Sequence, residues 1–327
     1  MRFLPPSATR DAALLLSSRG LRAFGDGLVS IVLPAYLLAL GCDAAQVGLL
    51  VTATLLGSSA STLLVGMLAT RFARKRLLIA LSLLMTATGI AFAAVGDFWP
   101  LLVVAFFGTV NPSTGDVSPI LPLEHAALTE TVKDSERTAL FARYSLVGTF
   151  AGAVGVLSAG VVDLLDDRMA ALRAMQFIFL GYAAIGVAAL LIYRGLSAGL
   201  DHAEARKAAP LGPSRGVVMR LAVLFSLDSF GSGFFVQSLL AVWLFERFDL
   251  SVAVTGWIFF AMGLLSALSY LAAVPIARRI GLVNTMVFTH LPANFCVMAL
   301  PFAPNLPVAI ALLMGRGLLS QMDVPTR

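Results

Sequence analysis

Long apolar segments, separated by short polar loops, occupy most of this chain. They are about 20 residues long or longer, which is the length that a helix needs to cross a hydrocarbon layer about 30 Å thick. Their hydrophobicity does not alternate from one residue to the next, as it does in the strands of membrane barrels. The pattern therefore predicts an all-α membrane protein with ten transmembrane helices. These spans lie near 14–40, 44–69, 77–96, 98–120, 139–163, 170–193, 217–245, 252–276, 282–302 and 306–327.

Composition and charge support this prediction and add an orientation. Apolar residues make up 59% of the chain and charged residues 13%, and the mean hydropathy is +0.91. With the N-terminus placed in the cytoplasm, 17 of the 23 lysines and arginines fall in inner segments and three in outer loops. This is the positive-inside bias of membrane proteins, so the net charge of +5 does not indicate a nucleic-acid partner. We expect a multi-pass protein of the inner, cytoplasmic membrane with a cytoplasmic N-terminus.

Sequence features of several other function classes are absent. The two cysteines, Cys42 and Cys296, form neither a disulfide framework nor a metal-ligand spacing. The sequence contains no nucleotide-binding glycine loop and no large extramembrane segment that could carry a Ser-His-Asp site. We therefore expect no enzyme activity, no bound metal and no cofactor.

An internal repeat relates the two ends of the chain. Three pairs of segments match, and their offsets of 206, 208 and 207 residues agree closely. Agreement of three separate matches indicates a duplicated structural unit. The matched segments are FGDGLVSIVLPAYLLALG from Phe24 with FGSGFFVQSLLAVWLFER from Phe230, LATRFA from Leu68 with IARRIG from Ile276, and FFGTVNPSTGDV ending at Val117 with LMGRGLLSQMDV ending at Val324.

This repeat predicts the domain organisation. Residues 1–193 form an N-terminal half with six helices, residues 194–216 form a polar cytoplasmic linker, and residues 217–327 form a C-terminal half with four helices. Parallel halves of this kind are common in transporters.

One loop motif carries a family resemblance. The segment GMLATRFARKR, Gly66 to Arg76, resembles the loop between the second and third spans of major facilitator superfamily transporters, whose pattern is Gly-x-Leu-Ala-Asp-Arg-x-Gly-Arg-Lys. Thr70 stands where the family has Asp, and Ala73 stands where it has Gly. The resemblance implies a helical bundle with two parallel halves and twelve spans, of which this chain has ten. We expect either a fragment of a twelve-helix protein or a truncated product.

The same resemblance implies a secondary active transporter that moves a small-molecule substrate by alternating access. The expected partners are that substrate, protons and the lipid bilayer, and the expected state is a monomer. We favour proton-coupled efflux of amphipathic compounds, because the expected cavity is rich in Phe, Leu and Gly. Two alternatives stay open: an uptake symporter for a small polar nutrient, and a truncated membrane protein that does not transport.

Charged residues in the first span are the candidates for proton coupling. An ionised side chain facing lipid costs on the order of 2.5 to 3.5 kcal/mol, so Arg22 and Asp26 are expected to face protein. Residues three and four apart share a helix face, which places Ser30 on the same side. Asp228 is the nearest acid in the second half of the repeat. In the alternative interpretation, the arginines extend to the cytoplasmic surface and Asp26 only neutralises them.

The resemblance places the first, fourth, seventh and tenth spans around a central cavity. Polar residues on these spans are therefore candidates for substrate contact, although the small ones could equally form hydrogen bonds between helices. In the fourth span, several prolines interrupt the helix next to the polar candidates, and such broken backbone is tolerated where it lines a cavity. The substrate candidates are Ser30, Asn111, Thr114, Gln237 and Arg316.

Four residues near the cytoplasmic ends are candidates for gating. Asp116 and its repeat mate Asp323 either form ion pairs with loop arginines, for which Arg71 and Arg74 are the candidates, or bind substrate. Asp323 also shares a helix face with Arg316, seven residues earlier, and Arg316 could pair with an acid across the cavity.

Overall fold

The computed structural model describes residues 4–69, 71–113, 116–164, 168–197, 215–232 and 235–320. This part of the chain is helical and contains no strand. The α-helices in it are α1 (Arg10–Ala39), α2 (Ala44–Leu68), α3 (Arg74–Ala94), α4 (Phe98–Phe107), α5 (Ile120–Leu128), α6 (Arg137–Ser158), α7 (Arg168–Arg194), α8 (Arg215–Ser232), α9 (Gln237–Phe248), α10 (Val252–Ile280), α11 (Leu282–Ala299) and α12 (Leu306–Leu319). Short 3-10 turns lie at η1 (Asp134–Glu136), η2 (Ala159–Leu164) and η5 (Leu300–Phe302).

Seven helices of the described residues are long and apolar enough to cross a membrane. Two of the ten predicted spans are interrupted, so spans and helices do not correspond one to one. The span predicted at 98–120 is divided between α4 and α5, and its second helix continues to Leu128. Pro112 and Pro119 explain the break, because proline has no N–H for the helix ladder and disfavours helical backbone in the residue before it. The span predicted at 217–245 is likewise divided between α8 and α9.

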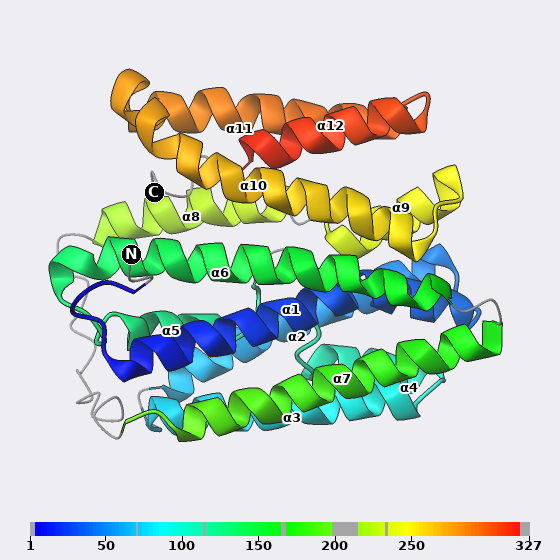
Figure 1. Cartoon of the computed structure of the whole chain (residues 1–327), viewed down its shortest axis with the longest axis horizontal. Helices are drawn as coiled ribbons and strands as arrows, with labels where there is room; N and C mark the ends of the chain where they lie inside the picture. The colour runs from blue at the N-terminus through cyan, green and yellow to red at the C-terminus, as the bar shows by residue number, and fades with distance from the viewer. Residues whose placement is uncertain are drawn as a thin grey trace.

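The helices lie side by side along the long axis of the molecule (Figure 1). Helix α1 is central and packs against α6 and α7, while α3 packs against α7 and α2 against α4. On the other side, α10 joins α6 to α12, and α11 packs on α12. Segments far apart in the sequence therefore meet along α1 and α6, which is where the functional candidates lie.

Small residues bring α1 and α6 into close contact. A Cβ atom at Gly27 would overlap the carbonyl oxygen of Gly152, and one at Gly155 would overlap the carbonyl oxygen of Phe24. Small residues at helix interfaces allow backbones to approach in this way in membranes. Glycines and alanines recur every three or four positions in residues 148–160, which provides the small surface that this contact requires.

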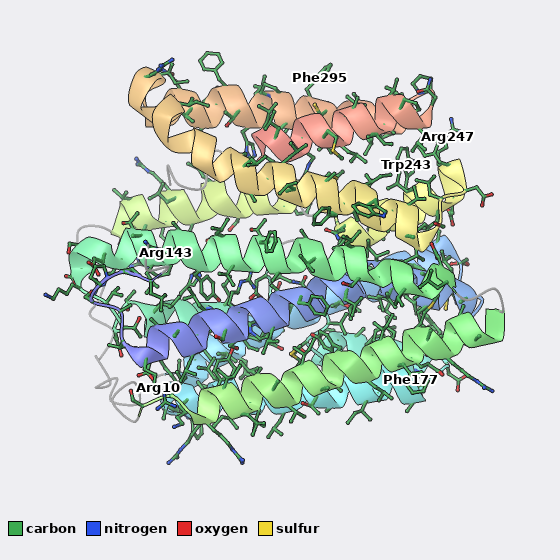
Figure 2. The ribbon with its side chains drawn as sticks, viewed as in Figure 1. Arg10, Arg143, Phe177, Trp243, Arg247 and Phe295 are labelled. Atoms are coloured by element: carbon green, nitrogen blue, oxygen red, sulfur yellow. The ribbon has the colours of Figure 1, made fainter. Side chains whose placement is uncertain are left out.

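The outer surface carries large apolar side chains between charged ends. Phe177 and Phe295 are 70% and 68% exposed and project outward from the bundle (Figure 2). Arg10 and Arg143 lie toward one end of the bundle, and Arg247 lies at the other (Figure 2). An apolar band between polar ends is the surface that a bilayer solvates.

Candidate functional site

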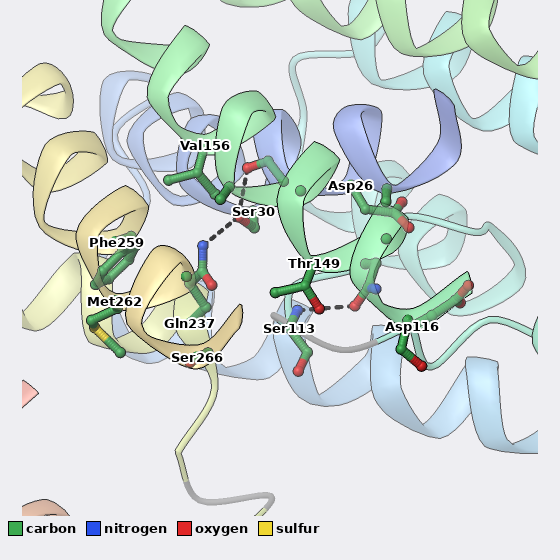
Figure 3. Close-up of a pocket in the computed structure, with 18 of the residues that line it drawn as sticks. Asp26, Ser30, Ser113, Asp116, Thr149, Val156, Gln237, Phe259, Met262 and Ser266 are labelled. Carbon is green, nitrogen blue, oxygen red and sulfur yellow. Dashed lines mark hydrogen bonds between the residues drawn. The ribbon is translucent and has the colours of Figure 1, made fainter. Parts of the chain in front are cut away.

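A cavity of about 280 Å³ lies at the centre of the bundle (Figure 3). It is lined by residues of α1, of the broken segment between α4 and α5, and of α6, α9, α10 and α12. Its polar wall includes Asp26, Ser30, Asn111, Ser113, Thr149, Gln237, Ser266 and Arg316, and its apolar wall includes Leu240, Phe259 and Met262. Four of the five substrate candidates therefore line one space. The fifth, Thr114, lies outside the described residues.

The polar face of α1 points into the protein, as predicted. Arg22 is 1% exposed, Asp26 is 8% exposed and Ser30 is fully buried. The alternative in which Arg22 extends to the surface is wrong. Two carboxylates inside the bundle hold its guanidinium there, which removes the need to reach water.

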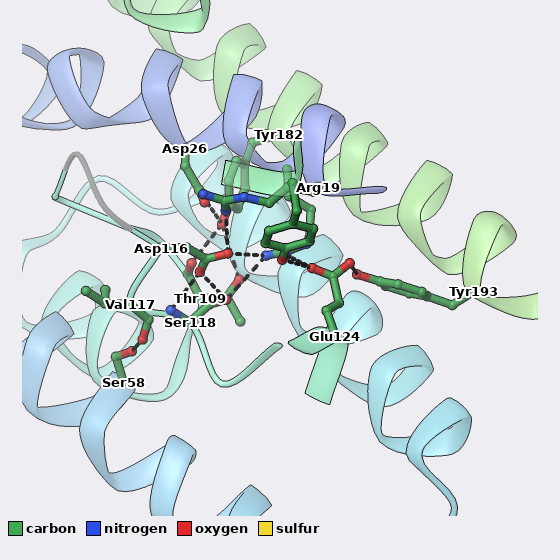
Figure 4. Close-up of polar contacts among 12 residues, drawn as sticks. Arg19, Asp26, Ser58, Thr109, Asp116, Val117, Ser118, Glu124, Tyr182 and Tyr193 are labelled. Atoms are coloured by element: carbon green, nitrogen blue, oxygen red, sulfur yellow. Dashed lines mark hydrogen bonds and ion pairs between the residues drawn. The ribbon is translucent and has the colours of Figure 1, made fainter. Parts of the chain in front are cut away.

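These carboxylates belong to Asp116 and Glu124 (Figure 4). Arg22 Nη2 lies 2.5 Å from Glu124 Oε2, and Arg22 Nη1 lies 3.1 Å from Asp116 Oδ2. Arg19 Nη1 lies 2.5 Å from the same Asp116 oxygen. The other Asp116 oxygen accepts hydrogen bonds from the backbone N–H and the hydroxyl of Ser118, at 2.9 and 2.6 Å. Both carboxylate oxygens of Asp116 therefore have partners, one on α1 and the other in its own loop.

The ion pairs predicted between Asp116 and loop arginines are therefore not formed. Arg74 forms its ion pair at the surface with Glu130, at 2.6 Å, and Arg71 is exposed. The broken backbone after α4 explains the difference, since it carries Asp116 back toward α1 instead of toward the loop between α2 and α3. The remaining gating candidate, Asp323, lies outside the described residues.

Glu124 was not predicted from the sequence. It is fully buried and accepts hydrogen bonds from the hydroxyls of Tyr144 and Tyr193, the latter at 2.7 Å. The expected fourth span ended at residue 120, which left Glu124 in a loop. The apolar run ILPLEHAAL was the available signal, because an acid within an apolar helix needs a partner.

Asp26 is less firmly held than these acids. Its Oδ1 lies 3.4 Å from the hydroxyl of Tyr182, which donates a shorter hydrogen bond of 2.8 Å to the carbonyl oxygen of Thr109. The side chain of Asn111 is a further hydrogen-bond partner. Among the described residues Asp26 has no ion pair, because Arg22 pairs with Asp116 and Glu124 instead.

Ser30 connects α1 to α9. Gln237 Nε2 donates to Ser30 Oγ at 2.8 Å (Figure 3), and the Ser238 hydroxyl donates to the Ser30 carbonyl oxygen at 2.6 Å. The backbone N–H of Ser238 also donates to the carbonyl oxygen of Pro112, at 3.1 Å. Residues 30 and 237 are 207 positions apart, one more than the offset of 206 in the repeat segment that contains Ser30. Positions within one residue of equivalence in the repeat therefore touch at this point.

Arg316 has an aromatic neighbour in place of the expected acid. Its guanidinium carbon lies 4.0 Å from the centroid of the Phe235 ring. Within the described residues it forms no ion pair, which corrects the expectation of an acid across the cavity. The side chain of Asp228, on α8, is outside the described part.

Comparison with known proteins identifies the family. The model of the Major Facilitator Superfamily matches residues 15–322. The chain belongs to this superfamily. It is therefore a multi-pass membrane protein of a transporter family and not an enzyme, which confirms the resemblance in the sequence.

Similarity to individual proteins is more distant. An uncharacterized membrane protein of Saccharomyces cerevisiae is 28% identical over 357 residues, which cover 98% of this chain and 80% of that protein. The partially occluded, inward-open xylose transporter XylE of E. coli has a TM-score of 0.70 at 14% identity, over 96% of this chain and 85% of that one. The human organic anion transporter MFSD10 has a TM-score of 0.67 at 18% identity, over 98% and 85%. At these identities the structures establish the shared fold.

Proposed function

We propose that the protein is a secondary transporter that moves a small solute by alternating access. In this proposal residues 1–193 and 217–327 are two halves that rock against each other, joined by the linker 194–216. The fourth span consists of α4 and α5 and the seventh of α8 and α9, which gives the ten spans expected from the sequence. The protein acts as a monomer in the inner membrane, with a cytoplasmic N-terminus.

The observation that carries this proposal is the cavity shared by helices of both halves. Its volume of about 280 Å³ is close to the lower end of the range for small-molecule sites, about 300 to 1,000 Å³. The hydrogen bonds of Ser30 with Gln237 and Ser238 join the halves beside it. Neutral hydrogen bonds contribute only about 0.5 to 1.5 kcal/mol each, so a gate made of them can open readily.

Proton coupling is proposed for Asp26. Its carboxyl group lines the cavity, is buried and lacks an ion pair among the described residues. Access of water determines whether a buried carboxyl group can exchange a proton with the solution on one side of the membrane. A change in access to the cavity can therefore load and release a proton at this side chain.

The test of this role is Asp26→Asn in reconstituted protein. The variant is expected to lose proton-driven accumulation while it keeps solute counterflow, which needs no proton movement. Asp97→Asn is the matched control, because Asp97 is exposed at the start of α4 and its side chain forms no capping hydrogen bond. If Asp26→Asn retained wild-type dependence on the proton gradient, Asp26 would have no part in coupling. If the wild type exchanged no solute at all, the alternative of a non-transporting protein would be favoured.

Efflux of an amphipathic solute remains our first proposal for direction, and uptake of a small polar nutrient is the second. The apolar wall of Leu240, Phe259 and Met262 favours the former, and the many hydroxyl and amide groups of the opposite wall favour the latter. Vesicle orientation distinguishes them. An antiporter for efflux accumulates solute in inverted vesicles with an acidic interior, whereas an uptake symporter accumulates it in right-side-out vesicles placed in acidic medium.

A further inference from the structure

We infer that Arg316 and Phe235 form a binding site for the carboxylate of an amphipathic organic anion. This inference rests on the proposed function, since it names the class of solute that the cavity takes. Arg316 takes no part in the ion pairs that Arg19 and Arg22 form from α1.

The geometry leaves the hydrogen-bond donors of Arg316 available. The guanidinium carbon lies 4.0 Å from the centroid of the Phe235 ring, a distance typical of a cation stacked on an aromatic face. Stacking covers one face of the planar group. Its five N–H donors lie in the plane and point away from its edges, where a carboxylate can accept two of them at once. Both residues line the cavity, so a ligand in the cavity can reach the guanidinium.

The charges around Arg316 leave it without a counterion in the described part of the chain. Asp116, the other acid of the cavity wall besides Asp26, is shared by Arg19 and Arg22. Asp26 has Asn111 and Tyr182 as its neighbours. A cation taken out of water without a partner carries a desolvation cost that an anionic ligand offsets.

The surroundings of the cation define the rest of the ligand. The Phe259 and Met262 side chains lie together on α10 and face the same space as Gln237 (Figure 3). Leu240 adds to this apolar wall from α9. A ligand that places its carboxylate on Arg316 would therefore contact apolar side chains with its remaining atoms. The cavity volume of about 280 Å³ limits it to one small molecule.

Binding of matched probes tests the inference. The probes are benzoate, phenylacetate and cyclohexanecarboxylate, each compared with its neutral amide, and binding to purified full-length protein is measured by calorimetry. We expect at least one carboxylate to bind the wild type about tenfold or more tightly than its amide. Arg316→Gln should weaken that carboxylate by about ten- to hundredfold, the usual range for a hydrogen bond to a charged group, and leave the amide unchanged. Arg316→Lys should restore part of the affinity, because lysine keeps the charge without the planar fork.

The chain offers a matched control in Arg247→Gln. Arg247 also lies over an aromatic ring, that of Phe248 at 5.9 Å, but it is exposed and outside the cavity. This variant should bind every probe as the wild type does. The inference is overturned if no carboxylate binds more tightly than its amide, or if Arg316→Gln keeps the preference for the anion.

Solute exchange in proteoliposomes separates this inference from the proposed function. Exchange of amides but not of carboxylates would overturn the anion site and leave the transport function standing. Carboxylate binding that depends on Arg316, without exchange of any probe or other solute, would support the site and contradict the transport function.

Discussion

Replacement of Glu124 by glutamine tests the buried ion network most directly. The wild-type carboxylate lies 2.5 Å from Arg22 and accepts two tyrosine hydroxyls in a site with no exposure to solvent. The glutamine amide keeps an acceptor for the tyrosines but removes the charge that neutralises Arg22. Among the described residues the guanidinium would retain one carboxylate, that of Asp116 at 3.1 Å, which it already shares with Arg19, and the Ser118 hydroxyl at 3.3 Å.

The loss of stability expected for Glu124→Gln follows from the burial of its ion pair with Arg22. Breaking a buried ion pair by removing one partner typically costs about 3 to 5 kcal/mol. Glu130→Gln is the matched control, because it removes the same charge from an ion pair of similar length, 2.6 Å, whose glutamate side chain is 39% exposed. A surface pair contributes about 0 to 1 kcal/mol. The two variants should therefore differ severalfold in the free energy of unfolding that each loses.

Reversible unfolding in mixed detergent micelles gives these free energies. A double-mutant cycle with Arg22→Met isolates the coupling, since contacting residues typically show interaction energies of about 0.5 to 3 kcal/mol. The double variant should lose less stability than the sum of the single variants, because it leaves no unpaired charge between positions 22 and 124. Equal losses for Glu124→Gln and Glu130→Gln, or strictly additive effects in the cycle, would refute the assignment of a buried ion pair.

Two further predictions concern packing and orientation. Gly27→Ala should destabilise the protein, because its methyl group would overlap the Gly152 carbonyl oxygen. Gly48→Ala should be neutral or stabilising by up to about 1 kcal/mol, since nothing lies near that position. Thermal unfolding compares the two variants, and equal melting temperatures would contradict the close contact at Gly27. Burial, and then the neighbouring Asp43, raise the pKa of the Cys42 thiol, which lies between α1 and α2. The reactive thiolate should therefore form only at a higher pH than in an unperturbed cysteine, and an impermeant maleimide added outside right-side-out vesicles should label Cys42 with a rate that rises across this raised pKa. Labelling only after the vesicles are opened would reverse the proposed orientation.

The polar face of α1 could be predicted because it follows from local geometry. Few polar residues occur in that span, and Arg22, Asp26 and Ser30 recur at four-residue spacing, so helical periodicity alone places them on one side. The cost of facing lipid then directs that side inward. The partners on the inner side could not be predicted in the same way, because Asp116 and Glu124 reach α1 only through the broken fourth span.

The length of the interruption in the fourth span could not be predicted from the pattern of apolar residues. Prolines indicate that the fourth span is interrupted, but they do not indicate how far the chain runs before helix resumes, which here is from Phe107 to Ile120. The helix that follows therefore extends beyond the predicted end and brings Glu124 into the bundle. Arg316 is a comparable case, because its ring partner Phe235 lies between α8 and α9, where a continuous helix was expected.

Contacts along α1 differ in how costly they are to break, and this difference bears on the proposed motion. Near its start, α1 is joined to the broken fourth span by buried ion pairs. Near its middle, Gly27 meets Gly152 of α6 at backbone distance. Farther along, only neutral hydrogen bonds join Ser30 to Gln237 and Ser238. In a rocking motion α1 would therefore stay with residues 1–193 and separate from α9 first.

The contact between α6 and α10 is suited to serve as the pivot of that motion. A Cβ atom at Gly263 would lie 2.9 Å from the Cβ of Ala153, and one at Gly256 would lie 3.0 Å from the Val156 carbonyl oxygen. Small residues allow the two helices to approach closely at these points, and no described ion pair joins them. In the proposed transport cycle, rotation about this line would break the hydrogen bond between Ser30 and Gln237 first. The buried ion pairs of Arg22 lie within residues 1–193, whereas the contacts between the two proposed halves near Ser30 are neutral hydrogen bonds that need less free energy to break.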